Sequence, residues 1–274
     1  MTINCNGNLI DLSSPKVMGI LNCTPDSFYD GGKFITDKDI LTQTEKMLNQ
    51  GATFIDIGGY SSRPNARHIS EKVELERIIP IVELLIQNFP EILISIDTFR
   101  SKVAVEAVLA GACMVNDISA GELDENMFVS IANLQVPYIL MHMQGTPQSM
   151  QQNPNYNHII KEIIYYFSNK IQQLKALGVN DFIIDVGFGF GKTSEQNYEL
   201  LQNLALFKSL DTPILTGISR KSMLYKTLDI TADKALNAST VAHTIALING
   251  TNILRVHDVL EAVEAVQIVN ALNR

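Results

Sequence analysis

The chain has 274 residues, of which 46% are hydrophobic and 18% are charged, a balance typical of globular proteins rather than disordered or membrane-embedded ones. The net charge of −8 argues against nucleic acid or an anionic membrane as partner, but leaves room for a small anionic substrate held by local cations. The 3 cysteines are scattered and form no CxxC pair, which argues against a disulfide framework or a zinc site. The N-terminus shows no signal-peptide pattern and no apolar run could span a bilayer, so we expect a cytoplasmic protein.

Short apolar runs rich in β-branched residues alternate with longer amphipathic stretches along the whole chain. The predicted strands are Lys16–Asn22, Thr53–Gly58, Ile92–Asp97, Cys113–Ile118, Pro137–Met141, Asp181–Asp185, Pro213–Ile218 and Asn252–Val256. The predicted helices are 38–50, 71–88, 101–110, 124–134, 156–177, 195–209, 232–248 and 258–272. Several helices end in a glycine directly before the next strand, as at Gly51, Gly111, Gly178 and Gly250, which is typical of a left-handed helix end.

This strand–helix alternation predicts an α/β fold with a parallel sheet. Eight cycles without a break in composition favour a (β/α)₈ barrel, also called a TIM barrel, formed by residues 1–274 as one domain. The alternative is a doubly wound open sheet, which more often has five or six strands. The segment 1–15 has no helical period, precedes the first barrel strand and is expected to cover the barrel bottom.

Polar or ionisable side chains follow nearly every predicted strand. They are Asn22, Asp97, Asn116, Asp117, His142, Asp185, Ser219, Lys221, Arg255 and His257. One such residue could simply cap the following helix. A whole ring of them indicates a ligand site instead, because active sites of barrels lie at the C-terminal ends of the strands.

The ring divides into groups with different chemistry. Asp97, Asn116, Asp185 and Lys221 offer acceptors, an amide and a cation to a planar heterocycle, since a carboxylate accepts the paired N–H donors of a 2-amino-4-oxo-pyrimidine edge. Arg255 and His257 suit a phosphate, together with Arg63 in a long loop. That loop, 60–66, and the loop 23–32 are long for connections in a barrel, and such loops commonly act as lids.

The stretch Gly187–Thr193 looks like a nucleotide-binding loop but fails both known templates. A P-loop requires glycine at position 186, which is Val, and a dinucleotide fingerprint requires glycine at position 192, which is Lys. We therefore expect these glycines to let the backbone approach a flat ligand beside Asp185. The role of nearby His142 stays open.

Eight segments in chain order resemble the motifs of dihydropteroate synthases. They are Asn22–Phe28, Asp56–Pro64, Ser95–Thr98, Asn116–Ser119, Met141–Pro147, Asp185–Lys192, Gly217–Ser222 and Arg255–Asp258, within residues 16–274. Each segment alone is a weak signal for the family, but eight of them in chain order are a specific one.

The resemblance implies a transferase of folate biosynthesis on a (β/α)₈ barrel. It would join 6-hydroxymethyl-7,8-dihydropterin diphosphate to p-aminobenzoate with Mg²⁺, giving 7,8-dihydropteroate and pyrophosphate. It further implies a homodimer and a target of sulfonamides, which mimic p-aminobenzoate. The alternatives are a pterin-binding barrel methyltransferase, which has no diphosphate leaving group, and a catalytically silent pterin-binding protein, for which we expect losses at Asn22, Lys221 or Arg255.

The resemblance also implies roles for individual residues. The pterin would contact Asp97, Asn116, Met141, Asp185 and Lys221, and the diphosphate would contact Asn22, Arg63, Arg255 and His257, with Asn22 as the Mg²⁺ ligand. The p-aminobenzoate pocket would comprise Phe28, Ser62, Arg63, Pro64, Phe190, Lys221 and Ser222. The catalytic set would be Asp30, Arg63, Lys221, Arg255 and His257, with Asp30 or Asp26 stabilising a cation-like methylene and Cys23 as an alternative nucleophile.

The second loop departs from the common wording of the family, Glu-Ser-Thr-Arg-Pro-Gly. Ser62 keeps a hydroxyl where threonine is frequent, so its pocket role is expected to survive. Tyr60 replaces a carboxylate, so no role that depends on charge transfers to it. Asn65 stands where glycine is frequent and tolerates a positive φ better than most residues.

Overall fold

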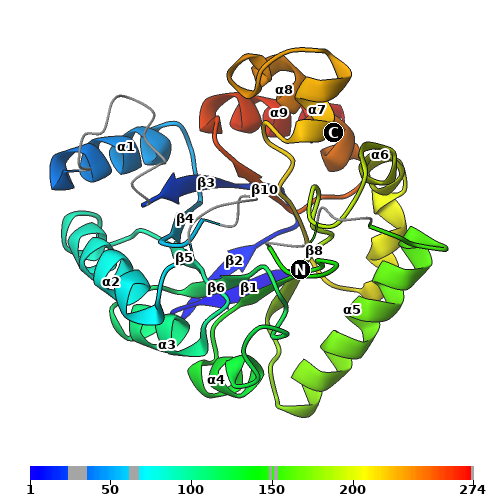
Figure 1. The fold of residues 1–274 in the computed structure, drawn as a ribbon. Coiled ribbons are helices and arrows are strands. Elements are labelled where there is room, and N and C mark those ends of the chain that lie inside the picture. Colours follow the sequence, from blue (N-terminus) through cyan, green and yellow to red (C-terminus); the bar gives the residue numbers. More distant parts are fainter. Residues whose placement is uncertain (24–35, 62–67, 148–149, 151–153, 273–274) are drawn as a thin grey trace.

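The computed structural model describes residues 1–23, 36–61, 68–147, 150 and 154–272. Its centre is a closed barrel of parallel strands in the order β10-β3-β4-β5-β6-β7-β8-β9, ringed by helices (Figure 1). The barrel strands are β3 (Lys16–Asn22), β4 (Phe54–Gly58), β5 (Ile94–Asp97), β6 (Met114–Asp117), β7 (Tyr138–Met141), β8 (Phe182–Asp185), β9 (Ile214–Thr216) and β10 (Ile253–Val256). The predicted (β/α)₈ barrel is confirmed, and the open doubly wound sheet is wrong because β10 pairs with β3 and closes the sheet.

Helices connect successive strands, as the periodicity predicts. They are α1 (Asp37–Asn49), α2 (Glu71–Asn88), α3 (Ser101–Leu109), α4 (Met127–Leu134), α5 (Ile159–Ala176), α6 (Ser194–Gln202), α7 (Ser222–Thr227), α8 (Leu236–Ile248) and α9 (Val259–Leu272), with short 3₁₀ helices η1 (Leu204–Leu210) and η2 (Ala232–Lys234). The predicted helix 195–209 is wrong in being continuous, since α6 ends at Gln202 and η1 follows. In the described part of the chain, no helix is long and apolar enough to cross a bilayer.

Strand alternation explains which side chains point into the barrel. In β4, Ile55 and Ile57 pack outward with helix residues, whereas Phe54 joins the apolar cluster inside the barrel. Asp56 lies two positions from Phe54 and therefore also points inward. The same alternation places polar side chains of β5, β6, β8 and β10 inside the upper barrel, above its apolar layer.

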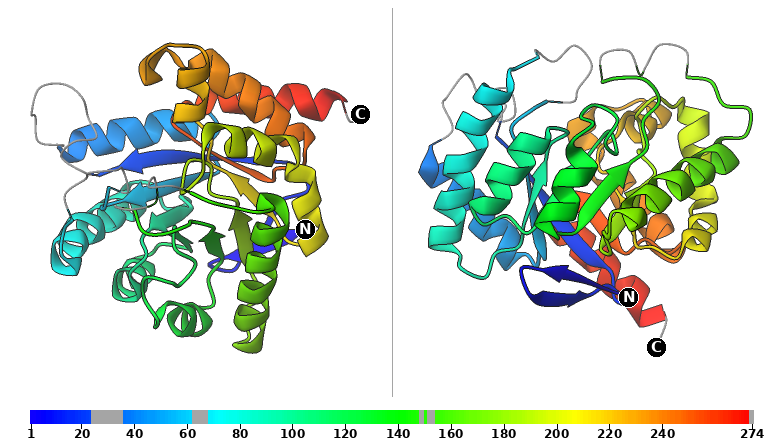
Figure 2. Two further views of the ribbon diagram at one scale, coloured as in Figure 1. Left: turned by 45° about the vertical axis from the view of Figure 1, so that its right-hand side comes forward. Right: turned by 90° about the horizontal axis from the view of Figure 1, so that it is seen from below.

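The N-terminal segment is a hairpin of β1 (Thr2–Cys5) and β2 (Asn8–Asp11), which lies at one end of the barrel (Figure 2, right). Ile3, Cys5 and Leu12 are buried against inward residues of the barrel strands such as Phe54. This confirms that the segment closes the barrel bottom, which directs ligands to the opposite end. The predicted left-handed helix ends are also confirmed, with φ of 98°, 119°, 80° and 99° at Gly51, Gly111, Gly178 and Gly250.

Candidate active site

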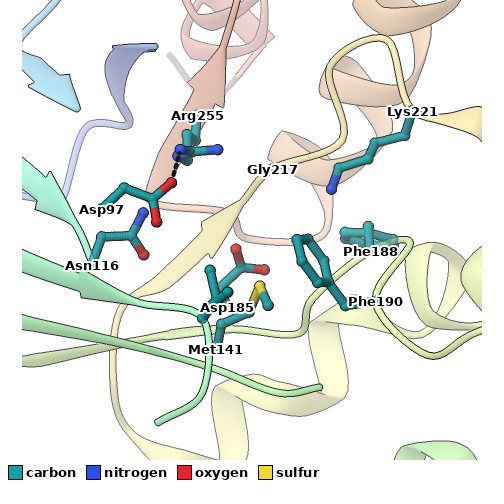
Figure 3. Close-up of a pocket in the computed structure, with 10 residues that line it drawn as sticks. Asp97, Asn116, Met141, Asp185, Phe188, Phe190, Gly217, Lys221 and Arg255 are labelled. Atoms are coloured by element: carbon teal, nitrogen blue, oxygen red, sulfur yellow. Dashed lines mark hydrogen bonds and ion pairs between the residues drawn. The ribbon is translucent and has the colours of Figure 1, made fainter. Parts of the chain in front are cut away.

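A pocket opens at the C-terminal ends of the barrel strands and holds much of the predicted polar ring. It is lined by Asp97, Asn116, Ile118, Met141, Asp185, Phe188, Phe190, Gly217, Lys221 and Arg255 (Figure 3). The residues come from β5, β6, β7, β8 and β10 and from the segments that follow β6, β8 and β9. Seven of them, Asp97, Asn116, Met141, Asp185, Phe190, Lys221 and Arg255, are among the site residues predicted from the sequence, and the structure brings them together in one pocket.

Arg255 is the centre of an ionic network on one side of the pocket. Its Nε donates to Asp56 Oδ2 at 2.6 Å, and its Nη2 donates to Asp97 Oδ2 at 2.7 Å. Figure 3 shows the guanidinium turned toward the Asp97 carboxylate. Burial raises the pKa of the Asp97 carboxyl above its usual range, and the Arg255 guanidinium opposes that rise.

Asp56 is a functional-site residue that the sequence reasoning missed. It is fully buried and accepts from Arg255, from Asn116 Nδ2 at 3.1 Å and from Ser95 Oγ at 2.6 Å. A buried carboxylate needs such partners, and here they are two side chains that line the pocket. Asp56 thus fixes the direction of both the guanidinium and the amide without lining the pocket itself.

Asp185 faces the pocket from the end of β8. Its Oδ1 accepts the backbone N–H of Gly187 at 2.8 Å, so the chain itself supplies one donor to this carboxylate. In the described part of the chain, no group donates to Oδ2. Burial raises the pKa of the Asp185 carboxyl, while the Gly187 N–H and the cations Lys221 and Arg255 oppose the rise.

Lys221 and Phe190 form the opposite wall (Figure 3). The Lys221 ammonium lies 4.3 Å from the centre of the Phe190 ring, a cation–π contact. Among the described residues, no acceptor lies within hydrogen-bond distance of the Lys221 Nζ. Burial lowers the pKa of Lys221 to about 8, and Asp185 opposes this shift. The ammonium can therefore bind an acceptor that the described part of the chain does not supply.

His257 and Ser219 sit beside the pocket at the ends of β10 and β9. Ser219 Oγ accepts the backbone N–H of His257 at 3.2 Å and contacts His257 Nδ1 at 3.1 Å. In the tautomer where the hydroxyl donates to Nδ1, the imidazole proton is on Nε2. Desolvation and the charge of Arg255 lower the pKa of His257 to about 4, although the residue keeps a face exposed to solvent.

The remaining predicted residues are placed as follows. Asn22 ends β3, and Ser222 is the first residue of α7, half-buried and outside the pocket lining. Asp117 has a structural role and does not line the pocket, since its carboxylate accepts hydrogen bonds from Ser119, Gly121 and Tyr138. Phe28, Asp30, Ser62, Arg63 and Pro64 lie outside the described residues, as do Asp26 and Asn65.

Tyr60, which stands where the family commonly has glutamate, packs by its ring. The ring meets Phe99 edge-on at 5.1 Å, and the Arg100 guanidinium carbon lies 5.5 Å from the ring centre. Arg100 takes its charge partner elsewhere, in the buried carboxylate of Glu74. The Tyr60 ring thus packs against Phe99 and Arg100, and Arg100 keeps its ion pair with Glu74.

A barrel whose mouth presents two acidic side chains, an amide, a lysine and an arginine to a flat apolar slot has the architecture of a pterin-binding enzyme. Residues 18–257 match the family described as pterin binding enzyme. The chain is 42% identical to dihydropteroate synthase of Escherichia coli over 273 residues, which cover 99% of this chain and 96% of that relative.

Solved structures agree with the sequence relatives. The Yersinia pestis dihydropteroate synthase with a sulfonamide drug has a TM-score of 0.94 and 41% identity, and the match covers 100% of this chain and 99% of that one. The Xanthomonas albilineans dihydropteroate synthase with 4-aminobenzoic acid has a TM-score of 0.92 and 35% identity, covering 99% and 98%.

The chain belongs to the dihydropteroate synthase family, transferases of folate biosynthesis. Each relative named here is a synthase, which decides against the pterin-binding methyltransferase and the silent protein that the sequence left open.

Proposed function

We propose that the pocket binds the pterin ring of 6-hydroxymethyl-7,8-dihydropterin diphosphate, with Asp185 as its principal anchor. One observation carries this assignment: the Asp185 carboxylate faces the pocket, keeps Oδ2 without a donor in the described part of the chain, and shares the pocket with the amide of Asn116. The amino and ring N–H groups of a pterin would satisfy that oxygen. Met141 lies in the same slot and would pack against the ring face.

Asp97 and Lys221 complete the ring contacts in this proposal. Asp97 is held by Arg255 and would accept from the pyrazine side of the pterin, while the Lys221 ammonium would donate to a ring nitrogen or to the carbonyl oxygen. The Lys221 pKa of about 8 keeps most of the ammonium protonated at pH 7. Lys221 thus meets the ligand as an ammonium.

The diphosphate is assigned to Asn22, Arg255, His257 and the loop residue Arg63. Two of the Arg255 nitrogens are engaged by Asp56 and Asp97, and Nη1 has no acceptor among the described residues, so it is available to a phosphate oxygen. The neutral His257 ring would donate from Nε2, since Ser219 occupies Nδ1. These donors would stabilise the charge that develops on the departing pyrophosphate.

Mg²⁺ is proposed as the metal that accompanies the diphosphate. The described residues contain no cluster of three or more His, Cys, Asp or Glu that could hold an ion by itself. This agrees with how Mg²⁺ usually binds, through one or two protein oxygens, several waters and the phosphates of the substrate. The amide oxygen of Asn22 at the end of β3 fits such a single protein ligand. When bound, the metal would offset charge on the leaving group.

The reaction needs little more than orientation and charge stabilisation from the protein. The amine nitrogen of p-aminobenzoate attacks the methylene carbon of the pterin, the carbon–oxygen bond to the diphosphate breaks, and the ammonium product loses its proton to solvent. No covalent nucleophile is required, and burial raises the pKa of the Cys23 thiol to about 12, which keeps it protonated at neutral pH. Asp30 or Asp26 is proposed to stabilise positive charge on the methylene.

The p-aminobenzoate site is proposed at Phe190 and Lys221, next to Ser222, with Phe28, Ser62, Arg63 and Pro64 from the two loops. The Xanthomonas albilineans relative crystallised with 4-aminobenzoic acid and the Yersinia pestis relative with a sulfonamide drug support this assignment. We expect sulfonamides to compete with p-aminobenzoate in this chain too.

A homodimer is proposed on the basis of exposed apolar residues on two neighbouring helices. Val241 and Ile248 on α8 and Ile268 and Leu272 on α9 are each more than half exposed. Apolar side chains grouped in this way commonly mark a protein interface. Light scattering coupled to gel filtration would give the molecular mass, and a monomer at micromolar concentration would contradict the proposal.

The pterin assignment is tested by Asp185→Asn. The variant keeps the size of the side chain but loses the charge that pairs with two N–H donors, so affinity for 6-hydroxymethylpterin should fall by about 2–4 kcal/mol. Calorimetric titration of the wild type and the variant measures this loss, and circular dichroism checks the fold. Wild-type affinity in the folded variant would move the pterin away from Asp185.

A further inference from the structure

Lys192 is a buried lysine that lies outside the pocket lining. It follows the glycine-rich stretch 187–191, which does not match the templates of nucleotide-binding loops, and it is only 3% exposed. Its Nζ lies 3.0 Å from Gly187 O, 2.9 Å from Phe190 O, 3.2 Å from His142 O and 3.0 Å from His142 Nδ1. The ammonium therefore joins the residue that follows β7 to the turn that follows β8.

The contacts suit a protonated Lys192. Carbonyl oxygens only accept, so Lys192 donates to them, and beside the ammonium form of Lys192 the His142 Nδ1 accepts as well. His142 is then neutral with its proton on Nε2, which agrees with a pKa held well below the usual range by burial and by the Lys192 charge. In the described part of the chain, no carboxylate lies within ion-pair distance of Lys192. The lysine is held by backbone carbonyls, and its position depends on theirs.

The turn that Lys192 contacts, residues 187–191, belongs to no helix or strand. Gly187, Gly189 and Gly191 all have left-handed φ, of 70°, 82° and 63°. A side chain on Gly191 would come within 2.6 Å of Gln144 O, so the turn lies directly on the segment after β7. Besides Lys192, Asn197 Oδ1 accepts the Gly189 N–H at 2.7 Å, Asp185 Oδ1 accepts the Gly187 N–H at 2.8 Å, and the Tyr156 hydroxyl donates to Gly191 O at 2.9 Å.

Phe190 is the side chain of this turn that reaches the site. Its carbonyl oxygen is bound by Lys192, and its ring lies on the Lys221 ammonium in the pocket wall (Figure 3). Asp185, by contrast, is held in β8 by pairing with Met141 of β7. A loosened turn would displace Phe190 most, whereas Asp185 would lose at most the Gly187 N–H while its backbone stays in β8.

We propose that Lys192 is a positioning residue for the reaction, which acts through Phe190: its ammonium fastens the Gly187–Phe190 turn to the end of β7 and so fixes the wall of the p-aminobenzoate site. The proposal rests on the assignment of Phe190 to that site under the proposed function. The proposal predicts that loss of Lys192 impairs p-aminobenzoate binding far more than pterin binding.

The test compares Lys192→Met, which keeps the length of the side chain without the donors, with Lys161→Met, which removes an exposed lysine of α5. We expect Lys192→Met to raise KM for p-aminobenzoate by about tenfold, equivalent to ~1.4 kcal/mol, with less than about a twofold change in calorimetric Kd for 6-hydroxymethylpterin. Hydrogen exchange of amides 187–191 should accelerate in Lys192→Met and stay unchanged in Lys161→Met.

A double-mutant cycle with Phe190→Ala tests the route of the effect. If Lys192 acts through Phe190, Lys192→Met should add less than about twofold to KM in the Phe190→Ala background. Additive effects, equal losses for both ligands, or unchanged exchange in the turn would each overturn the proposal. Should Lys192→Met fail to fold, Lys192→Gln supplies the same comparison with a shorter neutral side chain.

Failure of the proposed function gives a different result. In that case the wild type forms no dihydropteroate, whereas the exchange measurement still reports whether Lys192 holds the turn. Accelerated exchange with a wild-type KM for p-aminobenzoate would overturn the positioning role while leaving the contact itself established.

Discussion

Asp56→Asn should weaken both the fold and the pocket, because one carboxylate supports two pocket side chains. Asp56 is fully buried and accepts from Arg255, Asn116 and Ser95. An asparagine can present its amide oxygen to Arg255 and Asn116 and its NH₂ to Ser95, so the shape survives while the charge is lost.

The expected magnitude follows from those contacts. Replacing a charge-assisted hydrogen bond to a buried guanidinium by a neutral one removes part of an interaction worth about 1.5–3 kcal/mol. Arg255 keeps Asp97 as an ionic partner and is 20% exposed, so the loss stays below the ~3–5 kcal/mol of a buried charge left alone. We expect the free energy of unfolding to fall by about 2–3 kcal/mol.

Urea unfolding of the ligand-free protein measures this change, with Ser95→Ala as matched control. The control removes one neutral donor from the same carboxylate and should cost only about 1 kcal/mol. If the free energy of unfolding falls no more in Asp56→Asn than in Ser95→Ala, the ion pair between Asp56 and Arg255 does not stabilise the fold and the reasoning is refuted. Affinity for 6-hydroxymethylpterin should fall in Asp56→Asn as well, because a neutral acceptor holds Arg255 and Asn116 less firmly than a carboxylate does.

Three further predictions concern pH, the diphosphate donors and the order of binding. Burial lowers the pKa of Lys192 to about 7 from an ordinary 10.5, so the unfolded chain binds more protons between these values and the free energy of unfolding rises with pH across that window. Urea unfolding at pH 7 and 9.5 should show a smaller rise in Lys192→Met than in the wild type, and equal rises would exclude a perturbed lysine. Ser219→Ala, which removes the hydroxyl that fixes the His257 tautomer, should weaken pyrophosphate binding by ~1 kcal/mol and leave 6-hydroxymethylpterin unaffected in calorimetry. p-Aminobenzoate should bind measurably only after pterin diphosphate, because the sequence predicts long loops at 23–32 and 60–66 and ordering long loops on binding costs free energy; equal affinity in the ligand-free enzyme would show a preformed site.

The sequence was most informative where local patterns decide structure. Strand β3 and helix α2 are found at the predicted bounds, since β-branched runs and helical periodicity are local signals. Helix α7 has only 6 residues, too few to show a period, and was missed. The hairpin had an unused signal: Asn6-Gly7, with φ of 51° and 87°, is the residue pair that favours a two-residue turn.

The pocket residues were predictable one by one, but their pairing was not. A strand-end polar residue is visible in the sequence, whereas the bond between Asp56 and Arg255 joins positions 199 residues apart. Asp56 could have been suspected, because a lone carboxylate inside an apolar strand requires a partner. Lys192 belongs to the failed nucleotide motif, and only the closed barrel brings the Nδ1 and the carbonyl oxygen of His142 to it.

The most direct measurement supplies the purified chain with 6-hydroxymethyl-7,8-dihydropterin diphosphate, p-aminobenzoate and Mg²⁺, and follows both products. We expect 7,8-dihydropteroate and pyrophosphate to appear in equal amounts, with Asp185→Asn losing both. Release of pyrophosphate without dihydropteroate, or undiminished synthesis by Asp185→Asn, would contradict the assignment of this pocket as the site of condensation.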